Sequence, residues 1–160
     1  MFSFTLICVG KLKEKFYLDA AAEYQKRLRA YADFTLLELP EEKLPDAPSQ
    51  AQIAQALTRE AGAIRQKIPK GSWVCALAIE GKPLSSEALA ETLARVKRSG
   101  KSSACFVIGS SFGLDAEFKR QADFRLSMSP MTFPHHLARI MALEQLYRAE
   151  AIQAGSKYHK

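Results

Sequence analysis

Short apolar runs alternate with helical stretches along the whole chain, and this alternation restricts the fold more than any other feature. Runs of β-branched and aromatic residues predict strands, and apolar residues that recur every three or four positions predict helices. The expected strands are 4–9, 34–39, 73–79, 104–108 and 124–127. The expected helices are 14–31, 49–68, 85–98, 115–122 and 134–154. This order predicts an α/β fold with a mostly parallel sheet and helices on both faces.

Residues that start and stop helices support these boundaries. Ser49 and Gln52 have the spacing of a capping box, in which two side chains satisfy free N–H groups at a helix start. Pro69 ends the helix that follows, and Pro134 suits the first turn of the last helix. No internal repeat and no linker divides the sequence, so we expect one domain over residues 1–160.

The composition favours a folded protein that could meet a polyanion. Hydrophobic residues make up 48% of the chain, which is enough for a sizeable core and argues against disorder. The formal net charge of +6 suits a partner such as RNA. A moderately basic protein without such a partner would carry the same charge, so charge alone does not separate the two.

The cysteines and the apolar runs indicate a cytoplasmic protein. Cys8, Cys75 and Cys105 lie inside apolar stretches, without the spacing of a zinc site or a disulfide framework, so we expect buried, inert thiols. No apolar run is long enough to cross a bilayer, and the N-terminus lacks the marks of a signal peptide. We therefore expect a reducing, cytoplasmic location and no membrane partner.

Three loops are expected beyond the carboxyl ends of the strands, where ligands bind in α/β sheets. They are 80–83, 109–113 and 128–133. The sequence contains neither G-x-G-x-x-G nor a Walker A motif, the two glycine-rich patterns that bind phosphate groups. Residues 109–113 alone favour an ordinary turn over a ligand loop. Residues 127–132 combine hydroxyls with two methionines, which suits either a hydrated loop or the apolar wall of a pocket for a flat ring.

Side chains that can transfer protons or bind a charged ligand are concentrated in the last 35 residues. His135 and His136 point about 100° apart on a helix and cannot chelate one metal, so we expect no metal site. His135 and Arg139 share a helix face, either as a cationic patch for a phosphate or an anionic base, or as a surface pair beside a dimer seam. The terminal Tyr158 and His159 would ordinarily belong to a loose tail. The density of functional groups suggests instead that the tail folds back and is used.

Eight segments spread along the whole chain form a recognisable set: Val9–Lys13, Gly81–Lys82, Phe106–Gly109, Gly113–Leu114, Leu126–Ser127, Met131–His135, Leu143–Ala149 and Tyr158–Lys160. Taken together, these segments resemble the RlmH family of SPOUT-class methyltransferases. The sequence departs from the usual family pattern at Ser110, His136 and Lys157.

The resemblance implies a fold and a reaction. The family's C-terminal part, about 73–160 here, forms a deep trefoil knot, a rare exception to unknotted chains. The knot binds S-adenosylmethionine, and the enzyme methylates N3 of a pseudouridine in 23S ribosomal RNA, preferring the assembled 70S ribosome. The family is homodimeric, with the last helix at the interface and the active site shared between subunits. By position, the residues expected to contact the cofactor are Leu77, Gly109, Ser110, Met128, Ser129, Pro130, Met131, Thr132 and Phe133.

The expected catalytic residues are His135, Arg139, Tyr158 and His159. His135 or Arg139 would offset the anionic ring or hold a phosphate, and His159, or Tyr158 through it, would accept or relay the imide proton. Tyr158 could also stack on the base. Two alternatives are a non-catalytic, ribosome-associated RNA-binding protein and a SPOUT methylase that acts on tRNA.

Overall fold

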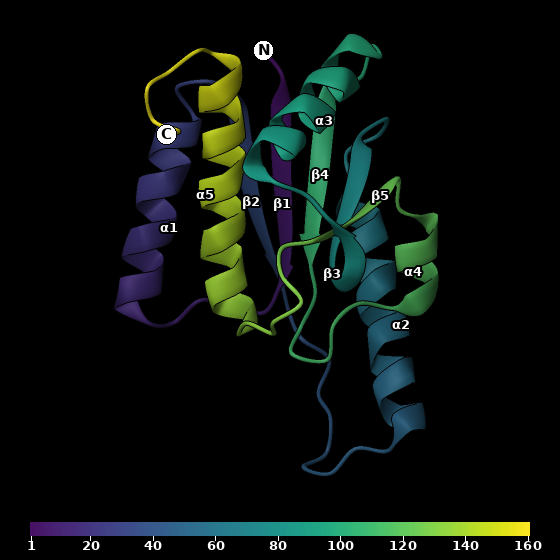
Figure 1. Ribbon diagram of the computed structural model, residues 1–160. Coiled ribbons are helices and arrows are strands. Elements are labelled where there is room, and N and C mark those ends of the chain that lie inside the picture. Colours follow the sequence, from purple (N-terminus) through teal and green to yellow (C-terminus); the bar gives the residue numbers. More distant parts are fainter.

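The computed structural model describes all of residues 1–160 and has the expected alternating order (Figure 1). The α/β prediction is therefore confirmed. The five strands are β1 (Ser3–Val9), β2 (Asp33–Leu39), β3 (Trp73–Pro83), β4 (Ser103–Ile108) and β5 (Phe124–Ser127). The five helices are α1 (Lys15–Leu28), α2 (Gln50–Lys67), α3 (Ser86–Arg98), α4 (Ala116–Gln121) and α5 (His135–Gln153).

The strands form one sheet in the order β2-β1-β4-β3-β5, and all of its pairings are parallel. Successive side chains of a strand point to opposite faces. Phe4, Leu6 and Cys8 therefore pack into a core with α1, α3 and α5. Ile7 and Val9 pack into a second core with α2 and α4. Figure 1 shows α1 and α5 side by side on the first face, and this three-layer arrangement leaves the carboxyl ends of the strands uncovered by helices.

Local sequence accounts for where the helices begin and end. The capping box at α2 is present: Ser49 Oγ accepts from the N–H of Gln52, and Gln52 Oε1 accepts from the N–H of Ser49. Ser85 caps α3 by accepting from the N–H of Ala88. Gly100 follows α3 with φ +93°, a conformation that glycine adopts without the strain of a side chain.

The third strand is longer than predicted, which corrects the expected turn at 80–83. β3 continues to Pro83, but its pairing with β5 is interrupted, since Leu77 and Lys82 both face Leu126. The residues between them leave the ladder, and the strand then rejoins it. A Cβ at Gly81 would lie 2.6 Å from the carbonyl oxygen of Arg125, so this excursion needs glycine. The sequence marked a break here but not the return of the chain to the sheet.

The three cysteines are free and buried, as predicted. Burial raises the pKa of the Cys8 thiol to about 12, and it raises the pKa of Cys105 to the same value. Both thiols are therefore protonated and inert at neutral pH. None of the five helices combines the length and hydrophobicity needed to span a lipid bilayer.

Candidate active site

The loops at the carboxyl edge of the sheet enclose a cavity of about 620 Å³, here called the loop cavity. The excursion of β3, the β4–α4 loop and the β5–α5 loop each form part of its wall. Two of these loops are in the predicted positions, and the third lies slightly earlier in β3. All of the residues expected to contact a cofactor line this cavity except Pro130.

The backbone of the β4–α4 loop is tightly folded. The N–H of Gly113 donates to the carbonyl oxygen of Ser110 at 2.8 Å, and Gly113 has φ +88°. A Cβ at Gly109 would lie 2.1 Å from the carbonyl oxygen of Gly113. Two glycines are therefore required for this turn, which brings bare backbone to the cavity wall.

The β5–α5 loop is held by its own serines. Ser127 Oγ donates to the carbonyl oxygen of Ser129, and Ser129 Oγ accepts from the N–H of Met131 at 2.9 Å. Met131 itself is 70% exposed at the cavity rim. Of the two interpretations left open for this segment, the geometry favours a pocket wall.

His135 stands at the edge of the loop cavity as the first residue of α5. It also lines an adjoining groove at the ends of β1 and β2, together with Lys11 and Glu41. Its Nε2 lies 3.8 Å from Glu41 Oε1. Burial and the neighbouring His136 lower the pKa of His135 below its ordinary value. The imidazole is therefore neutral at pH 7 and able to accept a proton.

Arg139 is placed differently from the expected cationic patch. Its side chain is 1% exposed, forms an ion pair with Glu38 of β2, and donates to the carbonyl oxygen of Gly10 at 3.0 Å. It does not line the loop cavity. Burial alone would raise the pKa of Glu38, but hydrogen bonds from the N–H of Leu12 and from Arg139 outweigh it and lower that pKa. This arrangement ties α5 to the sheet, one turn after His135.

The C-terminal tail folds back onto α5, as the sequence suggested. Tyr158 Oη donates to Glu144 Oε1 at 3.1 Å, and the Arg148 guanidinium lies 4.7 Å from the Tyr158 ring centre. Burial, together with the bond to Glu144, raises the pKa of Tyr158, so the phenol stays protonated. The tail is thus attached through two side chains of α5 whose roles the sequence did not reveal.

His159 is held at both ring nitrogens. Arginine can only donate, so Nδ1 accepts from Arg148 Nη1 at 3.0 Å. Nε2 then carries the hydrogen and donates to Glu87 Oε1 at 2.6 Å. In this arrangement His159 has no free lone pair to accept a proton.

The expected catalytic residues do not all meet within one chain. His135 begins α5, whereas Tyr158 is anchored at Glu144, roughly 13 Å further along the helix at about 1.5 Å per residue. Within a single chain, His135 therefore lines the loop cavity, whereas the C-terminal tail does not reach it.

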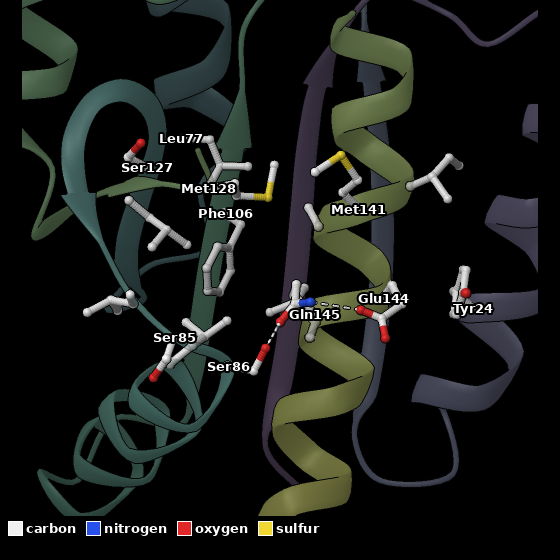
Figure 2. Close-up of a pocket in the computed structure, with 16 residues that line it drawn as sticks. Tyr24, Leu77, Ser85, Ser86, Phe106, Ser127, Met128, Met141, Glu144 and Gln145 are labelled. Carbon is white, nitrogen blue, oxygen red and sulfur yellow. Dashed lines mark hydrogen bonds between the residues drawn. The ribbon is translucent and has the colours of Figure 1, made fainter. Parts of the chain in front are cut away.

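A second, more apolar cavity of about 480 Å³ lies between α3, β5 and α5 and is here called the helix cavity (Figure 2). Two hydrogen bonds join residues that line it: Ser86 Oγ donates to Gln145 Oε1, and Gln145 Nε2 donates to Glu144 Oε2. Leu77 and Met128 line both cavities, so the two adjoin. Glu144 therefore connects the helix cavity to the anchored tail.

Solved structures of methyltransferases share this fold. A probable methyltransferase from Bordetella pertussis superposes with a TM-score of 0.54 at 14% identity, covering 92% of this chain and 95% of that one. A tRNA (m1G37) methyltransferase from Aquifex aeolicus gives a TM-score of 0.50 at 12% identity, covering 92% of this chain and 69% of that one. At these identities the likeness establishes the fold alone.

Sequence relatives are much closer and match along both full lengths. A protein of Moorella thermoacetica named ribosomal RNA large subunit methyltransferase H is 47% identical to this chain over 160 residues, and the match covers both chains fully. The same name is carried by a relative in Streptococcus mutans, 48% identical over 97% of this chain and 98% of that protein. A family model described as "Predicted SPOUT methyltransferase" matches residues 2–159. The chain belongs to the SPOUT methyltransferase family.

Proposed function

We propose that this protein transfers the methyl group of S-adenosylmethionine to 23S ribosomal RNA, at N3 of a pseudouridine in the assembled 70S ribosome. The observation that carries the proposal is the match, at 47% identity and over both full lengths, to proteins named for ribosomal RNA methylation. The loop cavity supplies the place for the reaction. The protein acts in the cytoplasm as one domain over residues 1–160, with the knotted part at about 73–160.

The residues of the loop cavity fit the cofactor. Leu77, Leu114 and Met128 offer apolar contact to a flat base, and the bare backbone at Gly109 allows close approach of a ligand. When bound there, S-adenosylmethionine supplies an electrophilic methyl group on a sulfonium sulfur.

His135 is the residue that removes the imide proton of the target base. Its ring is neutral at pH 7 and lines the cavity, which are the two properties that a general base needs. Arg139 and Glu38 act as positioning residues, because they fix the first turn of α5 against the sheet. Tyr158 stays protonated and so serves as a donor or a stacking surface for the base rather than as the proton acceptor.

The working enzyme is a homodimer in which the tail of one subunit reaches the loop cavity of the other. Two observations support this arrangement: the tail lies far from His135 of its own chain, and the helix cavity presents half-buried apolar residues of α5, such as Ile140 and Met141. A second copy of α5 packed there would bury that surface.

Subunit mixing tests the shared site. His135→Gln and a chain lacking 158–160 should each be inactive, yet a mixture allowed to exchange subunits should regain about a quarter of wild-type activity, since half of the dimers would be mixed and each would hold one intact site. A site built within one chain would give no recovery.

Methyl transfer from labelled S-adenosylmethionine tests the substrate. The acceptors are 70S ribosomes, free 50S subunits, naked ribosomal RNA and tRNA, all from cells lacking the protein. Label in 70S particles supports the proposal. Label in tRNA would favour a tRNA methylase, and no label with the cofactor bound to the protein would contradict the substrate assignment. Failure to bind the cofactor would favour a non-catalytic RNA-binding protein.

A further inference from the structure

Glu41, in the segment after β2, has the one carboxylate that lies within ion-pair distance of His135. Its Oε1 is 3.8 Å from Nε2 of that ring. The separation is too long for a hydrogen bond, but it suits an ion pair with a protonated ring. The Glu41 carboxylate forms no other ion pair, so a positive charge that appears on His135 meets an unpaired negative one. The proposed reaction creates such a charge when the imide proton moves to His135.

The backbone is fixed on both sides of Glu41. Before it, the carbonyl oxygen of Leu39 accepts from the N–H of Gly10 at 2.7 Å. After it, the N–H of Glu42 donates to Oε2 of Glu60 at 2.9 Å, and Glu60 is a buried residue of α2. Because one of these bonds is anchored in the sheet and the other in a helix, the backbone of Glu41 is held beside the start of α5.

Gly10 lies against both members of the pair. A Cβ at Gly10 would lie 3.5 Å from His135 Nε2 and 3.6 Å from Glu41 Oε1. Gly10 has φ +107°, which residues with side chains rarely adopt. Its carbonyl oxygen accepts from Arg139, one turn after His135. The same backbone position therefore orders α5 and leaves open space beside the pair.

We propose that Glu41 is a positioning residue for His135 and stabilises the ring once it has taken the imide proton of the target base. An ionised carboxylate can only accept, so a hydrogen directed at Glu41 lies on Nε2 and the free lone pair is on Nδ1. The N3–H bond of the base breaks and an N–H bond forms at Nδ1. The base keeps the electron pair and forms the new bond to the methyl carbon with it, while the C–S pair returns to sulfur. His135 is then a cation opposite the Glu41 carboxylate until it releases the proton to water.

The other charges around His135 do not supply this stabilisation. Burial lowers its pKa most, followed by His136, and Arg139 lowers it too, whereas Glu41 raises it. The charged groups of other elements that line the same groove and cavity are Lys11, Lys13, Glu38, Glu80 and Lys119. Glu38 pairs with Arg139, and Glu80 pairs with Lys119. Of the three carboxylates, only that of Glu41 is not taken by a lysine or an arginine.

The first test is an NMR titration of His135 in the free protein. The chain has three histidines, so each signal can be assigned by substitution. Glu41→Gln should lower the titration midpoint of His135 by about 0.2–0.7 pH unit, because the two side chains are 43% and 25% exposed and such pairs are weak. Glu41→Lys should lower the midpoint further, since a like charge then replaces the carboxylate.

The matched control is Glu14→Gln. Glu14 Oε2 lies 3.8 Å from Nδ1 of His136, and its side chain is 47% exposed, close to the value for Glu41. Glu14 also makes no capping hydrogen bond to α1, so its replacement leaves the helix start intact. This substitution should shift the midpoint of His136 by more than that of His135, the reverse of the effect of Glu41→Gln.

Methyl transfer to 70S ribosomes gives the second readout. In Glu41→Gln, the acid limb of the rate profile should move to lower pH together with the His135 midpoint, and the rate at neutral pH should fall roughly 2-fold because His135 is a weaker base. Affinity for S-adenosylmethionine should be unchanged in calorimetry. A change in that affinity equal to the change in rate would indicate a merely structural effect and overturn the inference.

Two further results would also overturn it: a His135 midpoint that is the same in Glu41→Gln and the wild type, and a shifted midpoint with an unchanged rate profile. The inference rests on the proposed function for the proton-transfer step. If the wild type transferred no methyl group to ribosomal RNA, the proposed function would fail. The titration would still decide whether Glu41 pairs with His135.

Discussion

The buried ion pair between Arg139 and Glu38 gives a quantitative test of how α5 is held. Glu38→Gln removes the charged partner of a guanidinium that is 1% exposed and leaves it with the carbonyl oxygen of Gly10 and a neutral amide. Breaking a fully buried pair costs about 3–5 kcal/mol. Glu38 is about a third exposed, and its replacement can still accept one bond, so we expect a loss of about 2–3 kcal/mol.

Urea unfolding measures this loss directly, and thermal unfolding should show a midpoint lower by roughly 5–10 °C for a chain of this length. The matched control is Asp19→Asn, which breaks a highly exposed pair with Lys15 and should cost less than about 0.5 kcal/mol. Because the folded-state pKa of Glu38 is lowered, the stability that it contributes is present above its unfolded pKa and is lost as the pH falls through the folded value. If Glu38→Gln lowered the free energy of unfolding by no more than Asp19→Asn does, the stabilising role of the buried pair would be refuted.

Three further outcomes follow from the site. His135→Gln should lower the rate of methyl transfer about 10²- to 10⁴-fold while cofactor affinity, measured by calorimetry, is retained. Since the pKa of His135 is lowered, the wild-type rate should stay constant through neutral pH and fall only below the ordinary titration range of histidine. A rate that already falls within or above that range as the pH is lowered would contradict this. Gly109→Ala places a Cβ 2.1 Å from the carbonyl oxygen of Gly113. We therefore expect either no cofactor binding in calorimetry or an unfolded protein by circular dichroism. Normal binding by a folded variant would contradict the loop geometry.

The order of the elements could be predicted because it depends on short-range patterns. The alternating apolar runs and the capping box at Ser49 need only neighbouring residues, and both are present in the structure. The continuation of β3 could not be predicted, since it depends on Lys82 meeting β5 more than 40 positions later in the chain. The sequence marked the break at Gly81 but contained no local sign of the return.

The site divides in the same way. The loops at the carboxyl edge follow from the topology of a parallel sheet, and two of the three, 109–113 and 128–133, were predicted in place. The partner of Arg139 is 101 positions away, so its spacing from His135 indicated a shared face but not burial. The contact of His159 with Glu87 spans 72 positions and depends on how the tail turns after α5, which no local pattern encodes.

The measurement that most directly tests the central claim is the yield and position of methyl groups in 23S ribosomal RNA. Ribosomes from cells lacking the protein would be incubated with the wild type or with His135→Gln and labelled S-adenosylmethionine, and the RNA digested and mapped by mass spectrometry. We expect about one methyl group per 70S particle from the wild type, on N3 of a single pseudouridine, and almost none from the variant. Methyl groups on another nucleoside, or an equal yield from both proteins, would contradict the account.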